Sequence, residues 1–197
     1  MSADNFSSNY LLQTANILNS LDIRSIDCAV DILASLRTSS GRLFICGVGG
    51  SAGHASHAVN DFRKICEIES YAPTDNVSEL TARTNDEGWD SFFVNWLRVS
   101  RLCGRDCLIF FSVGGGNVEA NVSVGLINAM SYAAKLDVRT IAIVGRDGGH
   151  IGKVATCVVN VPPIFPSAVT PHTEGITAVI WHLFVSHPRL QMNSTKW

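Results

Sequence analysis

The chain is poor in charge and has no stretch suited to binding a nucleic acid or crossing a membrane. Charged side chains make up 16% of its 197 residues, the formal net charge is -2, and the lysines and arginines form no block. Nucleic acids and anionic lipid surfaces require a basic patch, so neither is expected as a partner. The longest apolar runs, such as TAVIW, are far shorter than the roughly 20 residues of a membrane-spanning helix. We therefore expect a small-molecule or protein partner.

Cysteine pairs with the spacing of a metal site are also missing. The six cysteines include no CxxC motif and are scattered through apolar segments, which favours reduced thiols over a disulfide framework or a zinc ribbon. The first residues are polar and acidic, unlike the basic and then apolar start of a signal peptide. We expect a cytoplasmic protein.

The apolar content, 46%, is enough for one well-filled core. No linker or low-complexity tract interrupts the chain, so a single domain is expected over residues 1–197. Residues 6–20 and 24–37 carry apolar side chains at helical spacing. They predict an N-terminal helical hairpin within residues 1–38, which we expect to serve oligomerisation, followed by an α/β core over residues 39–197.

Strand-like runs alternate with helix-like segments along that core. The runs with strand character are RLFICG, DCLIFFSVGGGN, RTIAIVGRDGG and CVVNVP. Helices are expected over residues 51–65, 76–86, 89–103, 118–135 and 173–187. This alternation predicts a parallel sheet with helices on both faces, which is a three-layer α/β sandwich.

Two glycine loops, GVGGSAG and SVGGGN, follow predicted strands. In a parallel sheet, ligands bind beyond the carboxyl ends of the strands, where glycines and helix N-termini favour an anion. The alternative is that these glycines bind no ligand and are present only because the turn from strand to helix requires them. The first loop further fits the dinucleotide pattern GxGxxA from Gly47, with Glu67 or Glu69 as a ribose ligand. The charged segment FRKICE argues against the buried second strand that this alternative needs.

Metal-ligand side chains follow the first loop. On the predicted helix, His54, His57 and Asp61 share one face, and the last two are four residues apart, a spacing that can chelate one ion. The alternative is that these three residues bind no ion and form only a solvent-exposed polar stripe on the helix. In the apolar closing helix, Glu174 and His182 need partners. Their separation is about 12 Å along a helix, so convergence on one ion requires Glu174 near the helix start.

Several segments, taken together and in order, resemble the phosphoheptose (sedoheptulose 7-phosphate) isomerase branch of the SIS-domain sugar isomerases. They are GVGGSAGHASHAVND, Asn85-Asp86 after LTART, FSVGGGN, IAIVGRDGG and TEGITAVIWH. The resemblance implies a flavodoxin-like, five-stranded parallel sheet and a homotetramer with active sites at subunit interfaces. It also implies one Zn²⁺ or similar divalent ion per subunit. The implied reaction converts sedoheptulose 7-phosphate to glycero-manno-heptose 7-phosphate or acts on a related sugar phosphate.

Carried over residue by residue, the resemblance places the metal ligands at His57, Asp61, Glu174 and His182. It places substrate contacts at Gly49, Gly50, Ser51, Asn85, Asp86, Ser112, Gly114 and Asn117.

The chain departs from that family in both loops and in two ligands. Val48 stands where the family has asparagine, and the second loop has lost most of its hydroxyls. These changes leave open whether the sugar is phosphorylated. They also favour an alternative, a non-catalytic SIS protein that binds a phosphosugar or a protein partner. Asp61 replaces glutamate and Glu174 replaces glutamine, and retention of two acids and two histidines favours the enzyme.

Aldose–ketose isomerisation moves a proton between adjacent carbons through an enediol, so it needs a base, an acid and a group that stabilises an oxyanion. Asp61 is shorter than the glutamate it replaces by about 1.5 Å, and base catalysis does not tolerate misplacement on that scale. We therefore expect Glu174 to carry the proton, Asp61 mainly to hold the ion, and His182 to act as ligand or partner acid.

Overall fold

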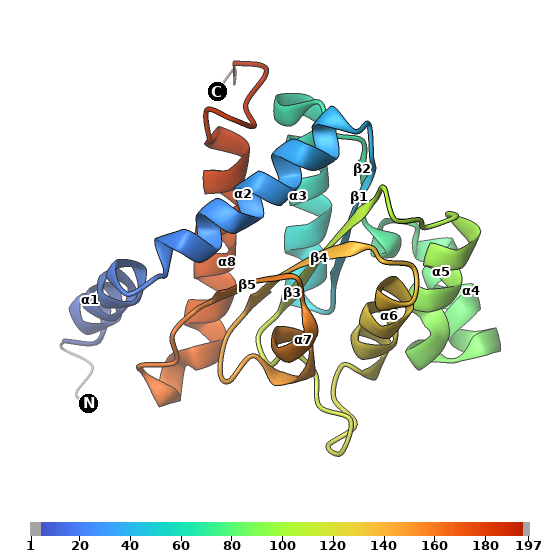
Figure 1. The fold of residues 1–197 in the computed structure, drawn as a ribbon. Coiled ribbons are helices and arrows are strands. Elements are labelled where there is room, and N and C mark those ends of the chain that lie inside the picture. The colour runs from blue at the N-terminus through green and yellow to red at the C-terminus, as the bar shows by residue number, and fades with distance from the viewer. Residues whose placement is uncertain (1–4, 195–197) are drawn as a thin grey trace.

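The computed structural model describes residues 5–194 and shows a parallel sheet between two layers of helices (Figure 1). The main elements are α1 (Phe6–Asn19), α2 (Ile23–Thr38), β1 (Leu43–Gly47), α3 (Gly50–Cys66), β2 (Ser70–Tyr71), α4 (Val77–Glu87), α5 (Phe92–Val99), β3 (Cys107–Ser112), α6 (Val124–Ala134), β4 (Arg139–Val144), α7 (Gly149–Val154), β5 (Cys157–Asn160) and α8 (Val169–Ser186). The five strands are parallel in the order β2-β1-β3-β4-β5. The predicted three-layer fold is confirmed.

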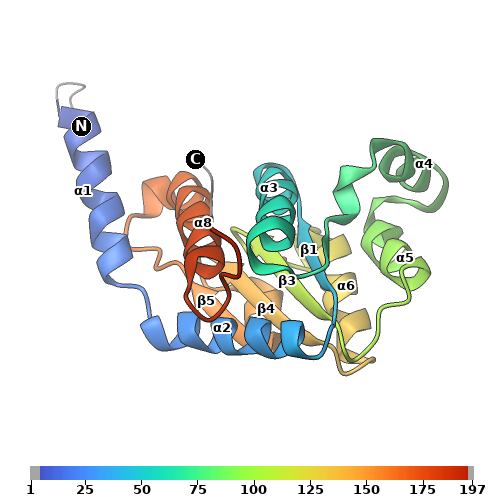
Figure 2. The same cartoon turned by 90° about the horizontal axis from the view of Figure 1, so that it is seen from above.

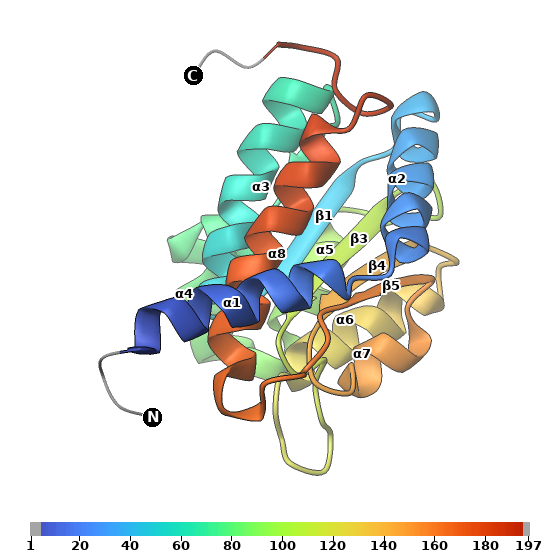
Figure 3. The same cartoon turned by 90° about the vertical axis from the view of Figure 1, so that its left-hand side faces the viewer.

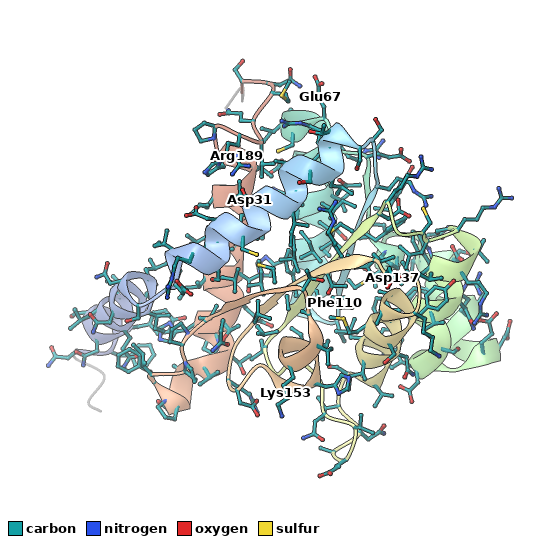
Figure 4. All side chains as sticks on the ribbon, viewed as in Figure 1. Asp31, Glu67, Phe110, Asp137, Lys153 and Arg189 are labelled. Atoms are coloured by element: carbon teal, nitrogen blue, oxygen red, sulfur yellow. The ribbon has the colours of Figure 1, made fainter. Side chains whose placement is uncertain are left out.

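Successive residues of each strand point to opposite faces of the sheet, which creates two cores. In β3, Ile109 and Phe111 face the layer formed by α2, α3 and α8. Leu108 and Phe110 face the layer formed by α5, α6 and α7, and Phe110 lies well inside the molecule (Figure 4). Because both faces of the sheet are covered, its strands read as continuous apolar runs rather than alternating ones.

Both predicted N-terminal helices form, but they have different surroundings. α2 lies on the sheet, with Val30 and Leu33 fully buried in the first core. α1 turns away from α2 and crosses the start of α8, standing out from the body of the molecule (Figures 2 and 3). Leu11 and Leu12 on α1 are 68% and 61% exposed. Of these two helices, as far as residues 5–194 show, α1 therefore has the larger uncovered apolar face.

The segment after the second glycine loop was expected to be helical from residue 118, yet α6 begins at Val124. Residues 117–122 turn back on themselves instead, with Asn117 and Val122 paired in an isolated antiparallel bridge. Val118 and Val122 are both at least half exposed. Their helix-like spacing therefore does not reflect a buried helix face.

Other helix boundaries also differ from those expected from the sequence. The closing helix begins at Val169, four residues before the expected start, and the helix expected over 89–103 is shortened to α5 after a 3₁₀ turn. The edge strand β2 was not visible in the apolar pattern because it is only two residues long. Within residues 5–194, no helix is both long and apolar enough to cross a bilayer.

The position of β2 weakens the dinucleotide alternative. Glu69 directly precedes β2, and its carbonyl accepts a hydrogen bond from the N–H of Leu43 at the start of β1. Glu67 is the C-cap of α3. Both acids therefore lie at the amino ends of the strands, on the opposite edge of the sheet from the glycine loops, where neither can bind a ribose held by the first loop.

Candidate active site

The carboxyl ends of β1, β3 and β4 surround a recess of about 360 Å³. Its lining combines hydroxyl groups with one carboxylate and one guanidinium: Val48, Ser51, Phe111, Ser112, Val113, Gly114, Val122, Ser123, Leu126, Arg146, Thr170 and Glu174. The volume falls in the range of small-molecule sites. Among the substrate contacts expected from sequence, Ser51, Ser112 and Gly114 line this recess.

The first glycine loop brings the chain from β1 into α3. Gly49 has a φ of 63°, which a glycine adopts without steric cost. Gly50 opens α3, and a Cβ built on it would come within 2.9 Å of Oε1 of Glu174. The missing side chain at Gly50 therefore leaves the space in which the Glu174 carboxylate lies, beside Ser51 at the recess.

The second glycine loop uses its remaining polar groups internally. The hydroxyl oxygen of Ser112 accepts a hydrogen bond of 3.1 Å from the N–H of Gly115. Oδ1 of Asn117 accepts one of 2.9 Å from the N–H of Ala120, and Asn117 lines a neighbouring recess of about 470 Å³ rather than the first one. The loop thus has one hydroxyl, that of Ser112, whose O–H can still donate to a ligand.

Asn85 and Asp86 are not brought to the recess within one chain. They are exposed on α4, where Nδ2 of Asn85 donates a 2.8 Å hydrogen bond to Oδ1 of Asp86. Figure 2 shows α4 at the edge of the molecule away from α8. A role in substrate binding would require another subunit.

Three of the predicted metal ligands come together between α3 and α8, which lie side by side (Figure 3). His57, Asp61 and His182 each offer one ligand atom, and these atoms all lie within 4.8 Å of one another. Nε2 of His57 is 3.7 Å from Oδ2 of Asp61. Ligand atoms around a tetrahedral zinc ion are about 3.3 Å apart, so small side-chain rotations would complete the contacts.

The burial of Asp61 fits a cation. Its side chain is 5% exposed, and only Oδ1 is paired, with Nδ2 of Asn60 at 2.9 Å. Oδ2 is buried without a hydrogen-bond partner among the described residues. A buried carboxylate oxygen with no partner is costly, and a divalent ion at this position would satisfy it.

His182 is oriented as a metal ligand. Its Nδ1 donates a 2.8 Å hydrogen bond to the carbonyl oxygen of Ala178, since a carbonyl can only accept. In the neutral ring, Nε2 then carries the free lone pair, which is the arrangement that metal-bound histidines adopt. The ring is stacked on Trp181, with 3.5 Å between centroids. These residues therefore form a possible metal site.

Glu174 is outside this cluster. It lies two turns earlier on α8, half-buried against Gly50, and lines the recess. The four ligands predicted from sequence are thus divided: three come together in one cluster, and the fourth lines the recess.

The sequence interpretation gave no role to His54 or Arg146. His54 is partly buried on α3, where burial lowers its pKa and the nearby charge of Glu174 opposes that shift. Arg146 follows β4 and lines the recess. The sequence did place His54 on the same helical face as His57 and Asp61, but it gave no ground for a role of its own. No local pattern indicates Arg146, because its position depends on how two loops dock.

Comparison with known proteins places this architecture in a family. Residues 9–145 match the SIS domain family. The chain is 31% identical over 162 residues to the phosphoheptose isomerase of Chlorobaculum tepidum, covering 77% of this chain and 74% of that protein. It is 28% identical over 190 residues to the lincomycin biosynthesis protein LmbN of Streptomyces lincolnensis, covering 91% of this chain and 67% of LmbN.

Among solved structures, the phosphoheptose isomerase GmhA of Neisseria gonorrhoeae superimposes with a TM-score of 0.81 at 24% sequence identity. The superposition covers 93% of this chain and 98% of that one. A phosphoheptose isomerase from Francisella tularensis gives a TM-score of 0.78 over 94% of this chain. The chain therefore belongs to the SIS domain family and is close to the phosphoheptose isomerases.

Proposed function

We propose that this protein is an aldose–ketose isomerase acting on a sugar phosphate, most closely sedoheptulose 7-phosphate or a related sugar. The observation that carries this proposal is the division of the site. Three metal-ligand side chains meet between α3 and α8, and Glu174, about two turns earlier on α8, places its carboxylate at the recess. The relatives named as phosphoheptose isomerases support the same reaction.

In this reaction Glu174 acts as the base. Its carboxylate takes the proton from the carbon next to the substrate's carbonyl, which gives an enediol, and returns it to the former carbonyl carbon. A second proton moves between the two oxygens. The hydroxyls of Ser51, Ser123 and Thr170 lie around the recess, where they can orient the sugar's own hydroxyls.

Asp61 holds the metal in this scheme, together with His57 and His182. A bound divalent ion supplies polarisation of the substrate's carbonyl oxygen. Asp61 is unsuited to proton transfer because its carboxylate is nearly buried and points into the cluster. The metal ligand His182 and the base Glu174 are therefore separated along α8, with His182 in the cluster and Glu174 at the recess.

Turnover of sedoheptulose 7-phosphate by the zinc-loaded protein tests the function. We expect interconversion with the aldoheptose phosphate and, in D₂O, deuterium at the carbon that exchanges its proton with the base. A panel of other ketose phosphates and free ketoses covers related sugars. No turnover on any of them contradicts the enzyme. Sugar-phosphate binding without turnover supports the non-catalytic alternative, which the hydroxyl-poor second loop favours.

We also propose a homotetramer in which α1 is covered by another subunit. Deleting residues 1–38 is a poor test, because α2 belongs to the core. Glutamate at both Leu11 and Leu12 should instead reduce the assembly to smaller species in light scattering, since charges would be buried at the interface. Val99→Glu, at an equally exposed apolar residue on α5, should leave the assembly intact. An unchanged assembly in the α1 variant argues against this interface.

A further inference from the structure

The recess has one positively charged side chain, and within residues 5–194 that side chain has no ion-pair or hydrogen-bond partner. Glu174 and Arg146 are the charged residues in its lining. Within residues 5–194 the arginines that pair with carboxylates are Arg24, Arg42, Arg83 and Arg189. Arg146 is exposed at the carboxyl end of β4. Arg146 lines this recess and two adjoining ones, and its guanidinium is free to bind an anion there.

Docking of the loop after β4 (residues 145–149) against the second glycine loop fixes the position of Arg146. The N–H of Gly145 donates to the carbonyl of Val113 at 3.1 Å, and the N–H of Ile151 donates to the carbonyl of Gly115 at 2.8 Å. A Cβ on Gly115 would fall within 1.8 Å of the carbonyl oxygen of Gly148. Because the loops touch backbone to backbone, Arg146 is held beside the second loop, where Cδ comes within 4.0 Å of a Cβ built on Gly114.

The second loop has few side-chain donors for an anion. They are the hydroxyl of Ser112 and the amide of Asn117, and Asn117 does not line the recess. A phosphate monoester carries close to two negative charges and needs several donors. Guanidinium supplies donors in a planar fork that matches phosphate oxygens, and its charge does not titrate near neutral pH.

We infer that Arg146 binds the phosphate group of the sugar phosphate at this recess, in the role that loop hydroxyls would otherwise fill. This inference rests on the proposed function for the identity of the substrate. Glu174 and Arg146 then contact different parts of one ligand: the carboxylate faces the carbons that exchange a proton, and the guanidinium holds the phosphorylated end. Arg146 therefore sets the specificity of the site for phosphorylated over free sugars.

Substitution by glycine gives a clean test because Arg146 has a φ of 52°. Glycine adopts this left-handed conformation more easily than arginine does, so Arg146→Gly should fold with unchanged or higher thermal stability. We expect KM for sedoheptulose 7-phosphate to rise about 10- to 100-fold, the usual effect of losing a hydrogen bond to a charged group, with kcat changed far less. Competitive inhibition by inorganic phosphate should weaken by a similar factor.

Two controls separate this role from general effects. Arg101 is also an exposed arginine with a φ of 54°, but it does not line the recess, so Arg101→Gly should leave KM and phosphate inhibition unchanged. Lys153 lines only the neighbouring recess and lies on α7 (Figure 4). An equal loss in Lys153→Gln would overturn the inference, because it would indicate non-specific charge attraction or another phosphate site. An unchanged KM in Arg146→Gly would also overturn it.

Calorimetric titration with inorganic phosphate keeps this test independent of catalysis. If the wild-type protein turns over no sugar, loss of phosphate binding in Arg146→Gly but not in Arg101→Gly still supports the assignment of Arg146. If the wild-type protein is active and both variants bind phosphate equally, the function stands and the assignment of Arg146 fails. Arg146→Lys should keep part of the binding, since it retains the charge but loses the fork.

Discussion

Replacing Glu174 with glutamine should stop isomerisation while leaving the metal bound. Glutamine keeps the shape of the side chain at Gly50 but cannot accept a proton. Because general acid–base catalysis contributes about 10²- to 10⁴-fold, we expect kcat to fall by a factor in that range. Steady-state rates on the active substrate, combined with metal analysis of the same samples, measure both halves of this expectation.

Two further variants serve as controls for Glu174. One replaces a glutamate outside the recess, and the other displaces the Glu174 carboxylate without removing it. Glu119→Gln, on the exposed loop beside the neighbouring recess, should keep the wild-type rate. Gly50→Ala places a methyl group where the Glu174 carboxylate now lies, so it should lower kcat without removing a titratable group. Wild-type turnover in Glu174→Gln would assign the base to Asp61 or to another residue.

The sheet was predictable because its central strands are fully buried. Runs such as RLFICG and CLIFFS consist almost entirely of apolar residues that end at glycine or serine. β2 could not be recognised, because a two-residue strand is defined by its pairing with Leu43 and Phe44 rather than by its own composition. The start of α6 was misplaced since Val118 and Val122 have helical spacing without helical burial.

The candidate site was predictable where it depends on local geometry. His57 and Asp61 are one turn apart on a single helix, so any helix over these residues places them together. Glu174 and His182 are eight positions apart, about 12 Å along a helix, and this length separates them in the structure. His182 meets the middle of α3, and Glu174 meets its start. The spacing in the sequence indicated that Glu174 and His182 are far apart. It did not indicate which of the two lies with His57 and Asp61.

Removal of either clustered histidine should abolish metal binding. We expect wild-type protein to carry close to one divalent ion per chain after zinc is supplied and excess is dialysed away. His57→Ala and His182→Ala each remove one of three ligand atoms. Loss of a residue that only supports a ligand weakens metal binding about 10- to 100-fold, so loss of a ligand should weaken it further. Metal analysis and competition with a zinc chelator give the affinities.

Thermal unfolding gives a readout that does not depend on activity. Zinc at about 100 times its dissociation constant should stabilise the wild-type protein by about 2.7 kcal/mol, and part of that gain comes from satisfying Oδ2 of Asp61. The two variants should show no such gain. His187→Ala changes a histidine that caps α8 outside the cluster, so it should respond to zinc like the wild type. A wild-type protein that neither retains zinc nor gains stability from it would leave Asp61 with a buried, unpaired oxygen and would rule out the metal site.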